Sequence, residues 1–257
     1  MVALFEKYRP AILADVVGQS RAVRQVENVI AKGWGGRAWW ITGPSGSGKT
    51  TIARIIARIG ADEIAIEELD AQRLTPARIN ELVKSYSSRS LFGAGGKCFI
   101  VNEAHGLRRD ALRELLTAIE PDGGLPGHIC WIFTTTKNGE AKLFDDDESG
   151  DTAPLLSRCI ELTLTYDEST RAAFASRARD IATREGIGGL PLSVYADVVG
   201  ASRGNMRRVL QQIESGSFRD DALAALERDY AMIKSTKGEQ AEQRRAALVK
   251  AIATIKG

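Results

Sequence analysis

The feature that most constrains this chain is a glycine-rich octapeptide, GPSGSGKT, at Gly43–Thr50. It fits the pattern G-x-x-x-x-G-K-[ST] at every fixed position. The apolar run Arg37–Thr42 (RAWWIT) comes directly before it, and helical spacing follows over Thr50–Ile59. Glycines let backbone N–H groups turn inward around an anion, and a helix N-terminus adds a favourable partial charge. The octapeptide therefore predicts a strand, a phosphate-binding loop and a helix, in that order.

The loop residues are the first candidates for a nucleotide site. The Lys49 ammonium is expected to reach the outer phosphates, and the Thr50 hydroxyl to bind Mg²⁺. A Gly-Ser loop that matches the pattern by chance is the alternative, and the flanking strand and helix oppose it. The candidate nucleotide-binding residues here are Gly43, Pro44, Ser45, Gly46, Ser47, Gly48, Lys49, Thr50 and Thr51.

Apolar runs and helical patterns alternate through the first two thirds of the chain, which predicts a parallel sheet with helices on both faces. The further strands are expected at Ile64–Leu69, Cys98–Asn102, Ile129–Thr134 and Cys159–Leu164, and the intervening helices at Pro76–Tyr86 and Arg109–Ile119. After Tyr166 only helices are expected, at Ser169–Glu185, Pro191–Val199, Asn205–Glu214, Asp220–Ser235 and Glu239–Lys256. We predict an α/β nucleotide-binding domain at 1–165, a three-helix domain at 166–216 and a short helical tail at 217–257. The acidic segment Phe144–Pro154 is expected to be a solvated loop.

Composition excludes some classes of protein. The formal net charge is only +2, so overall charge does not require a nucleic-acid partner, although a local basic surface stays open. No apolar run is long enough to cross a bilayer, and the start of the chain has no signal-peptide core. The three cysteines form no CxxC pair, which argues against zinc and favours buried thiols in a reducing, cytoplasmic compartment.

A second polar motif, Asn102-Glu103-Ala104-His105, ends the strand predicted at Cys98–Asn102. A carboxylate at this place is suited to orient an attacking water, so Glu103 is the candidate catalytic residue; a surface carboxylate is the alternative. Asn102 stands where ATPases of one large class carry an aspartate, and it joins Thr50 as a candidate magnesium ligand. Its side-chain oxygen accepts hydrogen bonds but supplies no charge. We expect His105 to be structural.

Several motifs together resemble the AAA+ ATPases and, within them, the clamp-loader subunits of bacterial DNA polymerase III and replication factor C. The resemblance covers roughly residues 5 to 214. Besides the two motifs above, it is carried by EKYRP (6–10), DVVGQ (15–19), TTTK (134–137), LLSRC (155–159) and GNMRRVL (204–210).

The resemblance implies roles for further residues. Tyr8, Arg9 and Val17 would lie near the adenine of ATP. Thr136 would sense the γ-phosphate, with Thr134 and Thr135 as alternatives. Two arginines would stabilise the transferred phosphoryl group, namely Arg158, which reaches the ATP of a neighbouring subunit, and Arg207, for which Arg208 is the competing choice.

The resemblance also implies a function and partners. The chain would be an ATP-hydrolysing subunit, with Mg²⁺, in a ring of itself or related AAA+ subunits, and it would act on a sliding clamp and primer-template DNA. Arg78, Lys84 and Arg89 are the candidate DNA contacts, and a solvated basic face is their alternative. Asn102 implies slow turnover. Two other functions stay open: a scaffold that scarcely hydrolyses ATP, and a remodeller of a protein client, which the short tail favours.

Overall fold

The computed structural model describes residues 2–88, 95–120, 124–136, 153–236 and 238–256. The chain divides into two compact units. One is Pro10–Thr165, and the other combines Met1–Arg9 with Tyr166–Gly257. Arg89 and residues 144–152 of the predicted acidic loop lie outside the described residues, and Ala153 and Pro154 begin a short helix, α6 (Ala153–Leu156).

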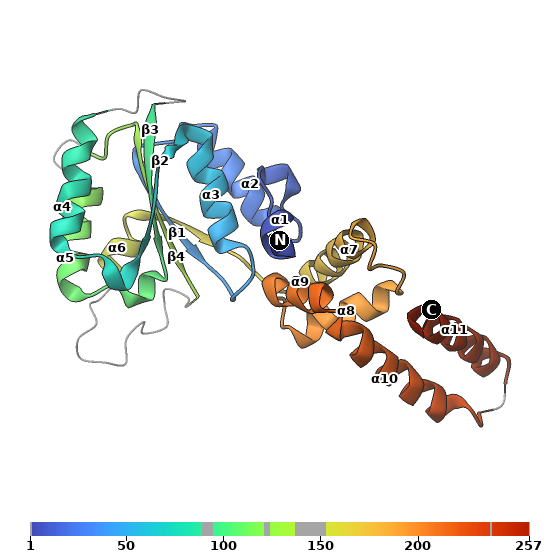
Figure 1. Cartoon of the computed structure of the whole chain (residues 1–257). Coiled ribbons are helices and arrows are strands. Elements are labelled where there is room, and N and C mark those ends of the chain that lie inside the picture. The colour runs from blue at the N-terminus through green and yellow to red at the C-terminus, as the bar shows by residue number, and fades with distance from the viewer. Residues whose placement is uncertain (1, 89–94, 121–123, 137–152, 237, 257) are drawn as a thin grey trace. The chain divides into compact units, whose positions relative to one another are not determined.

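The first unit is built on a five-stranded sheet in the order β2-β3-β4-β1-β5 (Figure 1). All of its strand pairings are parallel, which confirms the predicted fold class. Its strands are β1 (Arg37–Thr42), β2 (Ala61–Asp70), β3 (Gly96–Asn102), β4 (Ile129–Thr135) and β5 (Cys159–Thr163). Strand β2 starts before the predicted Ile64, and its register shifts between Ala61 and Ile66.

Helices cover both faces of this sheet, as the sequence predicts (Figure 1). Trp39 and Ile41 of β1 pack with α2 (Ser20–Ile30) and α3 (Lys49–Gly60). Trp40, between them in the strand, packs on the opposite face with α4 (Pro76–Lys84) and α5 (Arg109–Ile119). Successive side chains of a strand point to opposite faces, so an uninterrupted apolar run is what a strand buried on both faces requires.

Local signals fix the ends of several elements. The Thr75 hydroxyl accepts a hydrogen bond from the Arg78 N–H at 3.3 Å, and Pro76 follows as the first residue of α4. Single 3₁₀ turns connect other elements, at Leu13–Asp15, Ala71–Arg73, Ser85–Ser87 and Ala104–Gly106. The last of these turns carries His105, and Glu103 is the single residue between it and β3.

The second unit contains only helices among its described residues. They are α1 (Leu4–Lys7), α7 (Glu168–Arg184), α8 (Leu192–Ala201), α9 (Met206–Ser215), α10 (Ser217–Ile233) and α11 (Glu239–Lys256). Asp167 caps α7 by accepting a hydrogen bond from the Thr170 N–H at 2.8 Å, and this lowers the pKa of its carboxyl group. The division of residues 166–257 into a three-helix domain and a tail stays a prediction.

The N-terminal residues group with this helical unit, whereas the sequence placed them with the sheet. Leu4 of α1 is buried, with 6% of its surface exposed, and α1 contacts α9. The side chains of Lys7 and Tyr8 both donate hydrogen bonds to Glu185 and so lower the pKa of its carboxyl group. Residues 1–9 thus form part of the helical unit.

The cysteines are structural thiols. Cys98 and Cys130 are buried and pair in register on β3 and β4. Burial raises the pKa of the Cys98 thiol and raises that of Cys159 to about 12, so both stay protonated and unreactive near neutral pH. Among the described helices, none is both long and apolar enough to cross a membrane.

Candidate nucleotide site

The glycine-rich loop lies between β1 and α3 and requires glycine for steric reasons. Gly43, Gly46 and Gly48 have φ values of 151°, 74° and 105°, in the region that other residues rarely adopt. A Cβ atom on Gly43 would lie 2.8 Å from both the Cβ atom and the backbone oxygen of Leu164. The loop therefore turns tightly enough to start α3 at Lys49, one residue before the predicted Thr50.

Two polar groups within this loop fit a phosphate. The Lys49 ammonium donates hydrogen bonds of 2.9 Å to the carbonyl oxygens of Gly43 and Pro44, and Lys49 is only 7% exposed. The Ser47 hydroxyl is buried and has no hydrogen-bond partner among the described residues. Buried polar groups are normally satisfied, so an unpartnered hydroxyl beside a buried cation fits an anion that completes the site.

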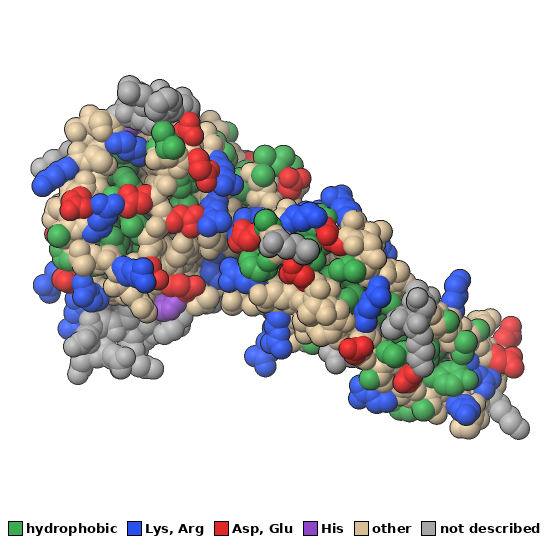
Figure 2. Space-filling model, in the orientation of Figure 1, with side chains coloured by type: hydrophobic (Ala, Val, Ile, Leu, Met, Phe, Trp, Pro, Cys, Tyr) green, Lys and Arg blue, Asp and Glu red, His purple; other side chains and the backbone are tan. Residues whose placement is uncertain are grey.

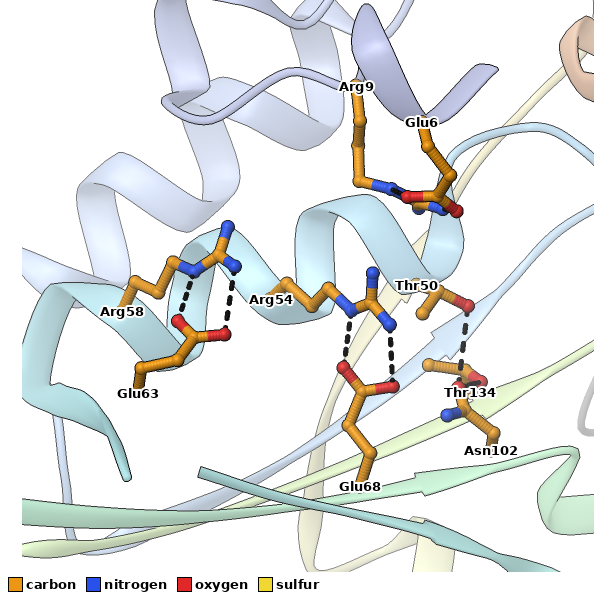
Figure 3. Close-up of polar contacts among 9 residues, drawn as sticks. All are labelled: Glu6, Arg9, Thr50, Arg54, Arg58, Glu63, Glu68, Asn102 and Thr134. Atoms are coloured by element: carbon orange, nitrogen blue, oxygen red, sulfur yellow. Dashed lines mark hydrogen bonds and ion pairs between the residues drawn. The ribbon is translucent and has the colours of Figure 1, made fainter. Parts of the chain in front are cut away.

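Asn102, at the end of β3, forms hydrogen bonds to residues of α3 and β4. Its Oδ1 atom accepts hydrogen bonds from the Thr50 hydroxyl at 3.4 Å and the Thr134 hydroxyl at 3.0 Å (Figure 3). The C-terminal ends of parallel strands meet at one edge of the sheet, which is why residues so distant in sequence converge. Hydroxyl and amide oxygens with bound phosphates are a donor set that suits Mg²⁺. No cluster of three or more His, Cys, Asp or Glu side chains that would hold a metal occurs among the described residues.

Thr134, one of the two alternatives to Thr136, is the threonine whose hydroxyl contacts Asn102. Thr134 is 2% exposed, whereas Thr136 is exposed beyond the end of β4. From the sequence, Thr136 was chosen among three consecutive threonines by its position in the resembling family. Only the structure shows which of the three side chains points toward Asn102. The role of Thr136 stays a prediction that the geometry does not favour.

Glu103 follows Asn102 in a left-handed conformation, with φ 54° and ψ 47°. Non-glycine residues at positive φ are uncommon and concentrate at functional sites. The Glu103 side chain is 53% exposed, and its Oε2 atom lies 3.4 Å from the Nδ1 atom of His105. The Glu103 carboxylate, the candidate for orienting the attacking water, is thus open to solvent. It lies one residue beyond Asn102, which contacts Thr50 and Thr134.

Arg158 is held in its own unit. Its Nε atom donates a hydrogen bond to the Glu120 carboxylate, and another of its N–H groups donates to the Pro154 carbonyl oxygen at 2.7 Å. The side chain is 34% exposed, so part of the guanidinium faces solvent while its position is fixed. Contact with a neighbouring subunit stays a prediction.

The other residues assigned by resemblance are divided between the two units. Tyr8, Arg9 and Arg207 belong to the helical unit, and Val17 to the sheet unit. Arg9 pairs with Glu6 (Figure 3), and the guanidinium carbon of Arg207 lies 5.7 Å from the ring centroid of Phe5. Their roles at the adenine and γ-phosphate stay predictions.

The predicted DNA contacts gain little support. Arg78 is paired with Glu67 and Glu81, which already neutralise its charge, and Lys84 is exposed at the end of α4. Acidic and basic side chains are interspersed over the face shown in Figure 2. Two further ion pairs, Arg54–Glu68 and Arg58–Glu63, join α3 to β2 (Figure 3) and were not foreseen from the sequence.

Comparisons with known proteins agree with these motifs. Residues 40–146 match the family model of the AAA ATPases, described as the ATPase family associated with various cellular activities. The chain is 42% identical over 112 residues to the replication factor C large subunit of Methanocorpusculum labreanum, covering 42% of this chain and 23% of that protein. It is 26% identical over 219 residues to replication factor C subunit 4 of Encephalitozoon cuniculi, covering 84% and 65% respectively.

Bacterial relatives and solved structures extend the match. The chain is 29% identical over 160 residues to DNA polymerase III subunit gamma/tau of Mycobacterium bovis, covering 53% of this chain and 27% of that protein. The Thermotoga maritima RuvB Holliday junction branch migration motor superposes with a TM-score of 0.62 at 20% identity, covering 86% of this chain and 67% of that chain, which shows a shared fold. The chain spans less than two thirds of the length of each of these curated relatives. The resemblance drawn from the sequence motifs is confirmed.

Proposed function

We propose that this chain, which matches the AAA ATPase family model over residues 40–146 and is similar to clamp-loader subunits, binds and hydrolyses ATP as one subunit of an oligomeric clamp-loader-like complex in DNA replication. The observation that supports this most directly is the convergence of Thr50, Asn102 and Thr134 beside the Lys49 loop. These residues come from α3 and from the ends of β3 and β4.

Each group has a task in phosphoryl transfer. Backbone N–H groups of the loop bind the phosphates, and Lys49 exchanges the carbonyl oxygens of Gly43 and Pro44 for phosphate oxygens. Thr50 and Asn102 would hold Mg²⁺, which neutralises charge on the phosphates when bound. The Glu103 carboxylate accepts a hydrogen bond from the attacking water and orients it in line with the leaving oxygen.

The active site would be completed by a second subunit. Arg158 is partly exposed and fixed by Glu120 and the Pro154 carbonyl oxygen, so its remaining donors are available to a neighbour's ATP. A rigid cation there stabilises the charge that spreads over the γ-phosphoryl group. Arg207 of the same chain would act from the three-helix domain predicted at 166–216. Such a complex would use a sliding clamp and primer-template DNA as partners.

A scaffold that binds ATP and scarcely hydrolyses it is the second candidate. Asn102 favours it, because the amide supplies no negative charge for a divalent cation. Glu103 opposes it, because a strained backbone that presents a carboxylate at this strand end has little use in a scaffold. ATP turnover of the purified chain, alone and then with primed DNA and candidate clamps, separates the two functions and also tests a protein-client role.

Mixing variants tests the shared site. Arg158→Ala should keep ATP binding and lose hydrolysis by about 10³-fold, as for arginines that act on another subunit's nucleotide. Lys49→Ala should lose ATP binding. Mixed in one complex, the two should recover turnover, because one supplies the arginine and the other the bound ATP.

Arg108→Ala is the matched control, since Arg108 is also an exposed arginine paired with a carboxylate, that of Asp110. It should leave turnover unchanged. If assembly is verified and the mixture stays inactive, Arg158 does not act across an interface.

A further inference from the structure

His105 lies between the buried core and the exposed candidate catalytic carboxylate. Its Nδ1 atom is 3.3 Å from the Thr135 hydroxyl oxygen and 3.4 Å from Glu103 Oε2. Thr135 is fully buried in β4, the His105 side chain is 30% exposed, and the Glu103 side chain is 53% exposed. The Thr135 hydroxyl and the Glu103 carboxylate therefore both lie near one nitrogen atom of the imidazole, Nδ1.

The backbone brings two of these groups together. Glu103 adopts its left-handed conformation, and its carbonyl oxygen accepts a hydrogen bond from the Gly106 N–H at 2.8 Å. This closes a tight turn immediately after β3. Strain of this kind persists only where the surrounding structure enforces it. The result is that Glu103 and His105, two residues apart, present their side chains to each other.

One nitrogen atom cannot serve both neighbours in the same way. An ionised carboxylate only accepts hydrogen bonds, whereas a hydroxyl both donates and accepts. With its proton on Nδ1, the ring donates to Glu103. With its proton on Nε2, the ring accepts from the Thr135 hydroxyl at Nδ1 and offers the carboxylate no donor. A hydrogen bond to a charged acceptor is the stronger of the two, which favours the proton on Nδ1.

We propose that His105 is a positioning residue for Glu103, with its Nδ1–H holding the carboxylate that orients the attacking water. This inference rests on the proposed hydrolysis at Glu103. It replaces the sequence-based expectation that His105 is only structural. The residue acts through Glu103 and touches no reacting atom.

Kinetic variants separate positioning from a structural role. His105→Ala should lower kcat about 10-fold and leave the KM for ATP unchanged, because the loop that binds ATP is intact while the carboxylate loses its orientation. His105→Asn should restore most of the loss, since its amide N–H can replace Nδ1–H. In a Glu103→Gln background, His105→Ala should cause no further loss, because residues that act as one unit are not additive.

The second histidine of the chain is the matched control. His128 lies in the same unit and contacts the Tyr86 carbonyl oxygen through Nε2 at 2.9 Å. His128→Asn should leave kcat unchanged. If Glu103→Gln keeps wild-type turnover, the proposed function at Glu103 is wrong. If Glu103→Gln stalls while His105→Ala keeps the wild-type kcat, only the positioning role is wrong.

A spectroscopic measurement decides the question without turnover. The chain has only two histidines, so ¹⁵N NMR signals of the His105 ring are assigned by comparison with His105→Ala. Wild type should show a protonated Nδ1 at His105, and Glu103→Gln should shift that signal while His128 stays in place. An Nδ1 of His105 without a proton, or one that does not respond to Glu103→Gln, would overturn the inference even if the chain hydrolyses no ATP.

Discussion

Replacing Asn102 by aspartate adds one negative charge at the end of β3 and preserves the local hydrogen bonds. The Oδ1 atom of Asn102 accepts from the Thr50 and Thr134 hydroxyls, at 3.4 and 3.0 Å, and a carboxylate oxygen accepts equally well. The side chain keeps its size and shape. Any change in the magnesium dependence of Asn102→Asp is therefore caused by the added negative charge.

The size of the effect follows from Coulomb's law. A unit negative charge about 5 Å from a divalent cation gains about 7 kcal/mol at an effective dielectric of about 20. Desolvation of the carboxylate opposes this gain, and phosphates already hold the ion, so a net gain of about 1–3 kcal/mol is expected. That corresponds to a magnesium midpoint about 5- to 150-fold lower.

The assay is ATP turnover across a magnesium titration. Asn102→Asp should lower the magnesium midpoint and raise turnover at limiting magnesium, while Glu103→Gln should bind ATP and stall. Asn102→Leu is a control that removes both the charge and the acceptor, and it should raise the midpoint. Unchanged midpoint and turnover in Asn102→Asp, together with full activity of Glu103→Gln, would refute a hydrolytic centre here and leave the scaffold function.

Three further predictions test particular contacts. Thr134→Val should lower turnover because its hydroxyl contacts Asn102, whereas Thr136→Val should not; the reverse ranking in steady-state assays would restore the sequence-based choice. Gly43→Ala should weaken ATP binding at least about 10-fold and lower the midpoint of thermal unfolding, because a Cβ atom would lie 2.8 Å from Leu164. Gly127→Ala is the control, since a Cβ atom there would have no neighbour within 4 Å, and calorimetry should show neither quantity changed. Leu4→Ala should destabilise the helical unit by about 2 kcal/mol, since Leu4 is buried there; an unchanged denaturation curve would show that residues 1–9 do not stabilise that unit.

The sequence alone determined the parts of this protein that depend on local pattern. The loop Gly43–Thr50 was recognisable because phosphate binding by backbone N–H groups needs glycines at fixed spacing. The strands Arg37–Thr42 and Ile129–Thr134 were recognisable because a strand buried on both faces must be apolar throughout. Both are short-range requirements, so the residues that satisfy them lie next to one another in the chain.

Only the tertiary structure decided which distant side chains meet. Thr134, not Thr136, reaches Asn102, because the facing of β4 and the strand order β3-β4-β1 determine which hydroxyl points to the loop. His105 lies close to Glu103 because of the tight turn after β3, and close to Thr135 because β4 is the neighbouring strand. Residues 1–9 join the helical unit through contacts with residues far along the chain, such as Glu185. Sequence patterns report local periodicity, whereas such contacts depend on how the whole chain packs.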